Sequence, residues 1–285
     1  MVSHAMLPFA ARLEGAVYRV YFSGRDAQNR SRPGYFDADL GDPGRCLRVA
    51  EQPLLDPGPP GTFDDAGVVL SWIVADEDTR YAYYVGWNLS VAVPFRNALG
   101  LAVSRDGGRT FGKYSAGPIL DRSVYDPCFV ASACVLREAV GWRMWYVSCV
   151  RWELTPTQTR HLYHIKYAES QDGIHWQPTG QTCIDFKSED EYAISRPCVL
   201  KEDGIYRMWY SYRGAAYRIG YAESGDGLHW ERKDEEAGID VSESGWDSEM
   251  IEYPFVFDHD GERYMLYNGN GYGATGIGLA VLAEA

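Results

Sequence analysis

The segments Arg143-Met144-Trp145-Tyr146 and Arg207-Met208-Trp209-Tyr210 are two copies of a short strand pattern that occurs five times in this chain. The other three copies are Tyr18-Arg19-Val20-Tyr21, Tyr81-Ala82-Tyr83-Tyr84 and Tyr264-Met265-Leu266-Tyr267. Their final tyrosines lie 63, 62, 64 and 57 residues apart. Recurrence at such a period indicates stacked β units, because one unit of this size cannot bury its own apolar face.

Two further elements accompany this strand. Tyr167-Ala168-Glu169-Ser170-Gln171-Asp172-Gly173 recurs as Tyr221-Ala222-Glu223-Ser224-Gly225-Asp226-Gly227, and an Asp-Gly pair between β-type runs is a strong hairpin signal. Short apolar runs such as Pro197-Cys198-Val199-Leu200 come before the strand. The sequence therefore predicts an all-β fold: one domain over residues 1–285, a five-bladed β-propeller of four-stranded antiparallel blades with a central pocket on one face.

The last repeat is shorter than the others, because the sequence ends soon after its third predicted strand, Ile277-Gly278-Leu279-Ala280-Val281-Leu282. Only five residues precede the first predicted strand at Met6. Two explanations remain open at this point: the last blade has three strands, or the native N-terminus lies further upstream.

Composition narrows the functional classes. The 285 residues carry a formal net charge of -13 and no long basic run, which argues against a nucleic-acid partner. No segment is apolar enough for a membrane span or a signal peptide, so we expect no membrane partner. The six cysteines show no C-x-x-C spacing, which predicts free thiols in a cytoplasmic protein rather than a zinc site or a disulfide framework.

Polar, charged and aromatic residues occupy the loops that the strand directions place on one face. Residues leading into the first strand of each repeat, or leaving the second, converge there. Those leading in are His4, Asp64, Asp65, Asp126, Ser195, Arg196, Glu249 and Glu252; those leaving are Arg25, Trp87, Asn88, Arg151, Arg213, Asn268 and Asn270.

Three blades thus present a carboxylate towards the axis: Asp65 (or Asp64), Asp126 and Glu249 (or Glu252). Cleavage of a glycosidic bond by acid–base chemistry needs one carboxylate to activate water and one protonated carboxyl to donate to the leaving oxygen. The competing interpretation is that these side chains cap turns or pair with arginines.

The residues carry a family resemblance over nearly the whole chain. Tyr125-Asp126-Pro127 and Asp247-Ser248-Glu249-Met250-Ile251-Glu252-Tyr253-Pro254 resemble motifs of the five-bladed propeller glycosidases, the superfamily of glycoside hydrolase families 32, 43, 62, 68 and 130. Ser3-His4-Ala5, Phe63-Asp64-Asp65 and Ser195-Arg196-Pro197 are similar to signatures of uncharacterised propeller proteins from bacterial polysaccharide and sugar-biosynthesis gene clusters.

The resemblance implies roles for three residues: Asp65 the general base, Asp126 the residue that orients and tunes the acid, and Glu249 the general acid. The chain departs from the pattern in three places. Its first repeat has His4 where some relatives have a carboxylate, and Asp65 is followed by alanine rather than proline. Glu249 lies five residues before Pro254, further out than a simple strand-start position.

Cationic side chains on the same face indicate an anionic ligand. Guanidinium groups match carboxylate or phosphate with two parallel hydrogen bonds. The cations in question are Arg25, Arg96, Arg151, Arg196 and Arg213, with His4, His164 and Lys166 near them. Phosphate, a nucleotide-sugar, a uronic acid and an ulosonic acid all fit this pattern, and pairing of each arginine with a neighbouring aspartate is the alternative.

We therefore expect a glycoside hydrolase-like enzyme that acts on an anionic glycoside or activated sugar. Three alternatives stay open: a phosphorylase that uses inorganic phosphate, a non-hydrolytic sugar or natural-product biosynthetic enzyme, and a non-catalytic sugar-binding protein. No cofactor and no metal site are predicted, since the axial calcium of some superfamily members has no contiguous ligand motif here.

Overall fold

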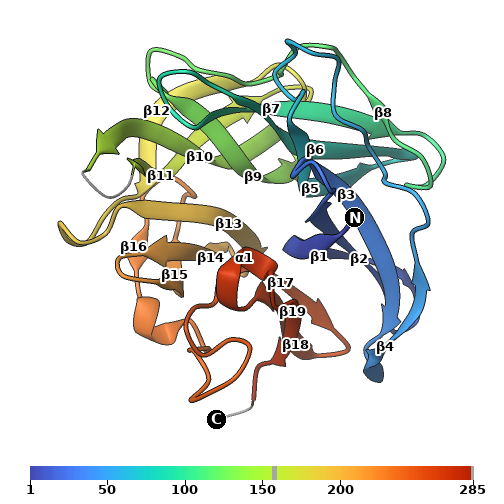
Figure 1. Ribbon diagram of the computed structural model, residues 1–285. Helices are drawn as coiled ribbons and strands as arrows, with labels where there is room; N and C mark the ends of the chain where they lie inside the picture. The colour runs from blue at the N-terminus through green and yellow to red at the C-terminus, as the bar shows by residue number, and fades with distance from the viewer. Residues whose placement is uncertain (156–158, 284–285) are drawn as a thin grey trace.

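The protein is built almost entirely of β-strands (Figure 1). The computed structural model describes residues 1–155 and 159–283. Its strands are β1 (Ser3–Glu14), β2 (Val17–Arg25), β3 (Ser31–Asp39), β4 (Asp42–Val49), β5 (Gly67–Asp76), β6 (Thr79–Leu89), β7 (Phe95–Ser104), β8 (Gly112–Lys113), β9 (Phe129–Glu138), β10 (Gly141–Leu154), β11 (Thr159–Ser170), β12 (Gln177–Ile184), β13 (Ala193–Glu202), β14 (Ile205–Arg213), β15 (Tyr217–Ser224), β16 (Glu231–Arg232), β17 (Glu252–His259), β18 (Glu262–Asn268) and β19 (Ile277–Val281). Two single-turn helices complete the fold, η1 (Asp234–Glu236) and α1 (Asn270–Gly273).

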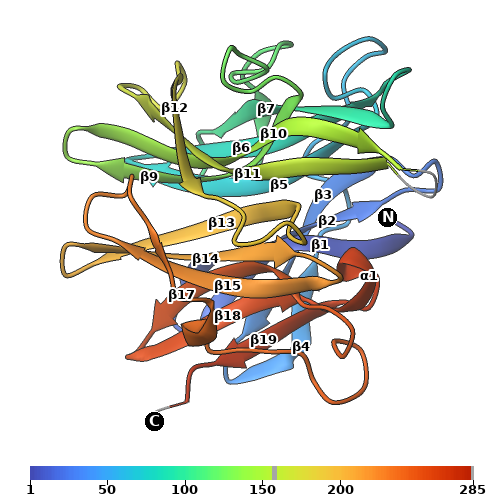
Figure 2. The same cartoon turned by 90° about the vertical axis from the view of Figure 1, so that its left-hand side faces the viewer.

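Consecutive strands pair antiparallel in five successive units. β1 to β4 form the first unit, β5 to β8 the second, β9 to β12 the third, β13 to β16 the fourth and β17 to β19 the last. Within the described residues the last unit has three strands, whereas each of the others has four. Figure 2 shows the last three units stacked on one another.

The first strands of the units surround a common axis. β5 contacts both β1 and β9, β13 contacts β9 and β17, and β17 contacts β1, so the contacts run once around the ring. In Figure 1 these strands lie around the middle of the molecule, and α1 lies near the middle on the side towards the viewer. The fold is thus the all-β propeller that the repeat predicts.

In three of the units, the final tyrosine of the repeat holds the unit to the loop before it. Tyr84, Tyr146 and Tyr267 are buried, and each hydroxyl donates to an aspartate twenty positions earlier in the sequence: Asp64, Asp126 and Asp247. A hydrogen bond from a buried phenol to a carboxylate satisfies both polar groups where water is absent. The motif is therefore a scaffold element.

Tryptophans of the repeat pack between units, as their place in the motif predicts. Trp145 of β10 lies against Tyr206 and Trp230 of the next unit, with ring centroids 5.8 and 6.1 Å away. Its indole nitrogen donates to the carbonyl of Gly227 at 2.8 Å. Large aromatic rings at such distances contribute both buried area and favourable ring contacts.

The Asp-Gly segments form the predicted tight turns. In the copy at residues 170–173, the Ser170 hydroxyl accepts from the Gly173 amide at 3.0 Å, and Asp172 accepts from the amides of residues 174 and 175. Gly173 has a φ of 73°, a value that glycine adopts without strain.

The first strand of every unit is bulged at the same depth. The register shifts fall after Met6, Leu70, Ala131, Ser195 and Glu252 in β1, β5, β9, β13 and β17. Three of the bulges carry a non-glycine residue at positive φ before a proline: Leu7, Arg196 and Tyr253. A bulge re-aims side chains locally, so these positions set what faces the axis.

All six cysteines are free, and four of them are buried. In the described part of the sequence, no helix is long and apolar enough to cross a membrane.

Candidate functional site

A cavity of about 490 Å³ lies where the five units meet. Every unit contributes to its wall, which places it on the ring axis, as the sequence predicts. Its polar and aromatic lining residues are Arg25, Asn29, Ser31, Trp87, Phe95, Asn97, Phe129, Ser132, His161, Tyr163, Ser195, Arg213, Tyr217, Tyr253 and Tyr272. Concave sites of this size with aromatic walls and a few polar groups are typical ligand pockets.

The three carboxylates expected at the axis do not line this cavity. Asp65 is half-buried in a turn, where it accepts from the Gly61 amide at 2.8 Å. Asp126 is fully buried and accepts from the hydroxyls of Ser148 at 2.6 Å and Tyr146 at 3.1 Å. Glu249 is exposed to solvent. None of the three therefore belongs to the cavity wall, and turn and scaffold contacts engage two of them.

Of the predicted ligand-binding residues, four line the cavity: Arg25, Trp87, Ser195 and Arg213. The Ser195 hydroxyl is buried there, and no described residue forms a hydrogen bond with it. The Trp87 indole nitrogen donates to the Ser31 hydroxyl at 3.2 Å, which leaves the ring free to face a ligand. These side chains come from β2, β6, β13 and β14, the strand ends that the repeat predicts.

Several other predicted residues act in the scaffold instead. Arg196 is fully buried and donates to the carbonyls of Pro8 and Ser71, thus joining units one, two and four. Asn268 accepts from the Leu7 amide at 3.0 Å and donates to the Ala5 carbonyl at 2.7 Å, which ties the last unit to β1. Cross-ring hydrogen bonds of this kind compensate the burial of polar groups.

Three other predicted cations, His164 and Lys166 of β11 and Arg151 of β10, do not line the cavity. The Lys166 ammonium donates to the Tyr125 carbonyl and lies 3.8 Å from the Asp126 carboxylate. His164 pairs with Asp185 at 3.1 Å, and burial lowers the pKa of its imidazole. Arg151 is exposed and forms a 2.6 Å ion pair with Glu153.

The remaining predicted residues are engaged locally. Asp64 is buried and accepts from the Lys113 ammonium at 2.6 Å. Asn88 and Arg96 are register partners in the β6–β7 hairpin. Asn270 caps the loop before β17 by accepting from the amides of Glu249 and Met250. None of these residues, nor His4, lines the cavity.

Arg213 is the central cation of the cavity wall. Its guanidinium donates to the Tyr272 hydroxyl at 2.6 Å and lies over the rings of Tyr217 at 5.3 Å and Tyr192 at 5.3 Å. Arg25 donates to the Asn29 side chain at 2.8 Å. Among the described residues, neither arginine forms an ion pair with a carboxylate. Both charges therefore remain available to an anion.

Glu252 is the one predicted carboxyl that belongs to this region. It is fully buried at the start of β17, and neither of its carboxyl oxygens has a hydrogen-bond partner among the described residues. Burial raises the pKa of Glu252 well above its usual value, while Arg213 and the Tyr253 hydroxyl oppose the rise.

His161 supplies a neutral imidazole to the cavity wall. It stacks on Tyr163 with ring centroids 4.8 Å apart. Burial, aided by the Arg213 charge, lowers the pKa of His161 to about 4. At neutral pH this side chain is therefore uncharged and can accept a hydrogen bond.

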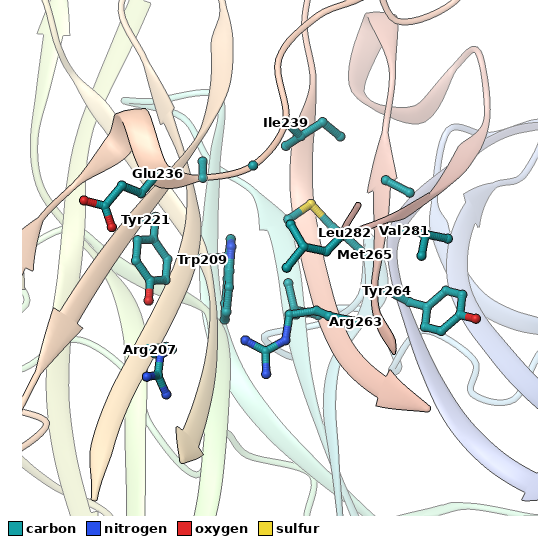
Figure 3. A pocket seen from close by; sticks show the side chains of 14 residues that line it. Arg207, Trp209, Tyr221, Glu236, Ile239, Arg263, Tyr264, Met265, Val281 and Leu282 are labelled. Carbon is teal, nitrogen blue, oxygen red and sulfur yellow. The ribbon is translucent and has the colours of Figure 1, made fainter. Parts of the chain in front are cut away.

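A second cavity, of about 210 Å³, lies between units four and five, away from this set of residues (Figure 3). Trp209 and Tyr221 line one side of it, and Met265 and Leu282 line the other. The Arg263 guanidinium in its wall is already paired with Asp258 at 2.8 Å. An apolar space with a neutralised cation offers little to a polar ligand, so we assign it to packing between units.

The sequence analysis missed four tyrosines of the axial cavity: Tyr163, Tyr217, Tyr253 and Tyr272. One signal could have found Tyr253. The dipeptides Leu7-Pro8, Arg196-Pro197 and Tyr253-Pro254 occupy the same position in their repeats, and the structure places all three at a bulge facing the axis. In the described residues, no group of three or more metal-ligating side chains is placed to hold an ion.

Solved structures with the same architecture come from glycoside hydrolases. The protein resembles BT0996, solved as a complex with RGII, with a TM-score of 0.78 and 16% identity over 99% of its own length and 88% of the other. A thermostable family-43 glycoside hydrolase matches with a TM-score of 0.74 and 17% identity, over 100% of this protein and 91% of the other chain. An endo-arabinase from Bacteroides thetaiotaomicron matches with a TM-score of 0.67 and 13% identity, over 100% of this protein and 95% of the other chain. At these identities the likeness establishes the propeller fold.

No protein-family model matches the sequence. Two curated proteins of Mycobacterium tuberculosis align with 98% of it and with 93% of their own length. They are the uncharacterized protein MT1551 of strain CDC 1551 / Oshkosh, 47% identical over 280 residues, and the uncharacterized protein Rv1502 of strain H37Rv, 46% identical over 280 residues. The protein belongs to the family of these two proteins, and its fold is that of the propeller glycoside hydrolases.

Proposed function

We propose that the protein is a glycosidase-like, carbohydrate-active enzyme that binds an anionic glycoside or activated sugar in the axial cavity. One observation carries the proposal. The cavity is walled by aromatic rings and two arginines without an ion-pair partner, and among the described residues no aspartate or glutamate lines it. A neutral sugar would leave both guanidinium groups unmatched, whereas a carboxylate or phosphate satisfies them.

The aromatic rings suit the apolar faces of a sugar. Trp87, from the second unit, and Tyr272, from the last, lie in the wall together with Arg213. Such rings bury area at low entropic cost, and the arginines supply the directional contacts that fix orientation.

The proton source for bond cleavage in this proposal is Glu252. Burial raises the pKa of its carboxyl and so favours the protonated form, which is the state that a general acid requires. When the proton has left, the Arg213 charge favours the resulting carboxylate. This assignment replaces the sequence-based one, in which Glu249 was the acid and Asp65 the base.

The test is turnover of a panel of 4-nitrophenyl glycosides of glucuronic acid, N-acetylneuraminic acid, glucose and arabinose. We expect release of nitrophenol from a sugar acid. Arg213→Met should lower kcat/KM for that substrate by about 10- to 100-fold, the effect of losing a charged hydrogen bond. The matched control is Arg151→Met, because Arg151 is exposed and paired with Glu153. No turnover of any glycoside, together with no calorimetric binding of glucuronate, refutes the proposal.

A phosphorolytic variant has one observation in its favour. No lining carboxylate is present among the described residues to activate water, and inorganic phosphate is itself a nucleophile that Arg25 and Arg213 could hold. In that case product release depends on added phosphate and the product is a sugar phosphate. Phosphate-independent release of free sugar excludes this variant.

A further inference from the structure

The wall of the axial cavity differs from one side to the other. Both of its arginines come from units one and four. Units two and three, which contact each other through β5 and β9, contribute no arginine, lysine, aspartate or glutamate to the wall among the described residues. The apolar side chains that they contribute include Val69, Val85, Leu89, Pro94, Phe95 and Phe129. In Figure 1 their strands β6, β7, β9 and β10 lie together in the upper part of the view. The cavity thus has a cationic side and, over units two and three, an apolar side.

Four rings of the apolar side form a continuous cluster. The Phe95 ring lies 5.8 Å from the ring of Phe129 and 5.8 Å from that of His161, and His161 stacks on Tyr163. Trp152 packs against this cluster from outside the cavity lining, with its ring 5.3 Å from that of Phe95. The cluster carries no net charge at neutral pH, because burial lowers the pKa of His161 to about 4. Uncharged rings of this kind favour contact with another apolar group.

The ring cluster is joined to the cationic side. The hydroxyls of Tyr163 and Tyr217 share a hydrogen bond, and the Tyr217 ring lies 5.3 Å from the Arg213 guanidinium. The two sides of the wall are therefore contiguous, so one ligand can contact both. A cavity of about 490 Å³ has room for such a ligand, because pockets of this size bury drug-sized molecules.

The apolar side continues to the surface of the molecule. Leu89 and Phe95 are register partners in the β6–β7 hairpin, and both line the cavity. Leu89 is nevertheless 75% exposed, and Val91 in the loop of the same hairpin is also exposed. A single exposed leucine is ordinary. Here it extends a wall that Pro94 and Phe95 form inside the cavity, so a bound apolar group can reach the surface along this side.

We propose that the apolar side binds an apolar aglycone, the group that a glycosidase releases, so that the substrate is an anionic glycoside with an apolar aglycone. This inference rests on the proposed function. The anion of the sugar contacts Arg213 and Arg25, and the aglycone lies against Phe95 and Phe129. A second sugar in that place would set its hydroxyls against a largely apolar wall, which is unfavourable without hydrogen-bond partners.

The experiment measures dissociation constants by isothermal titration of the methyl and phenyl thioglycosides of glucuronic acid and of N-acetylneuraminic acid. A sulfur link resists cleavage, so the measurement reports binding and not the ease with which the leaving group departs. We expect the native protein to bind a phenyl thioglycoside at least about tenfold more tightly than the methyl compound of the same sugar, because the ring is buried against apolar side chains.

Two variants test which side chains give this preference. Phe95→Ala should lower the phenyl-to-methyl affinity ratio by about threefold or more and keep the methyl affinity within about twofold. Leu89→Ala should act in the same direction, and its fold is safe because the side chain is exposed. The matched control is Arg213→Met, which should weaken binding of both compounds and leave the ratio unchanged, because Arg213 belongs to the cationic side.

Three results would contradict these expectations. Equal affinity of the native protein for the methyl and phenyl compounds overturns the apolar aglycone and leaves the proposed function standing. A native preference for phenyl that neither Phe95→Ala nor Leu89→Ala reduces overturns its assignment to this side of the cavity. Binding of none of the four thioglycosides counts against the proposed function itself, and the aglycone site falls with it.

Discussion

The buried Glu252 carboxyl makes a prediction that requires no substrate. Replacing Glu252 by glutamine keeps the shape of the side chain and removes the group that titrates. Because burial raises the pKa of the folded carboxyl above the usual value of about 4.3, the folded state binds more protons than the unfolded state at pH values between the two pKa values. The unfolding free energy of the native protein must therefore fall as pH rises through that window, and that of Glu252→Gln must not.

The size of the effect follows from linkage. Each pH unit between the unfolded and folded pKa values of one group changes stability by about 1.4 kcal/mol. The unfolding free energy of Glu252→Gln, relative to that of the native protein, should thus rise by this amount for each pH unit above about pH 4.5, until the pH passes the folded pKa of Glu252. Above that pH the two curves of unfolding free energy against pH become parallel again. The pH at which they do so gives the folded pKa.

The assay is urea unfolding followed by tryptophan fluorescence at half-unit steps from pH 4.5 to 8. Glu249→Gln is the control, because Glu249 lies exposed on the same segment and its curve should parallel that of the native protein. Parallel curves for the native protein and Glu252→Gln across the whole range would refute the burial argument and, with it, the assignment of Glu252 as a proton source.

Three further outcomes are expected. Asp126→Asn should lower the unfolding free energy by about 3 kcal/mol, seen as a lower melting temperature, because its carboxylate accepts from the Ser148 and Tyr146 hydroxyls; an unchanged melting temperature contradicts its scaffold role. Asp65→Asn should keep kcat/KM within about twofold, as for other substitutions away from a site, and a loss of 10²-fold would restore the base that the sequence suggested. In the pH–rate profile, kcat/KM should fall as pH rises through the folded pKa of Glu252. A transition near pH 4.3 instead would indicate an ordinary exposed carboxylate.

The ring could be predicted from the sequence, because a strand motif that recurs at a regular period requires neighbouring units to bury it. The loops that converge on one face could also be predicted, since Arg25, Trp87, Ser195 and Arg213 all line the axial cavity. The roles of the carboxylates could not be predicted. Asp64, Asp126 and Asp247 each accept from the final tyrosine of a repeat, a contact made across twenty residues that no local pattern announces.

The same limit explains why Tyr253 was harder to predict. It lies at the bulge in β17, where the regular alternation of side chains along a strand is interrupted, and it lines the cavity. Arg196 was misjudged for a related reason. Arg196 lies at the same kind of bulge, but its guanidinium donates to carbonyls of two other units. These contacts depend on how the ring closes.

The most direct test of the account is a crystal structure of the protein with a bound sugar acid, identified by the glycoside panel. We expect a carboxylate or phosphate within hydrogen-bond distance of Arg25 and Arg213. A sugar seated instead among the loops of Asp65 and Glu249, with both arginines uncontacted, would contradict it.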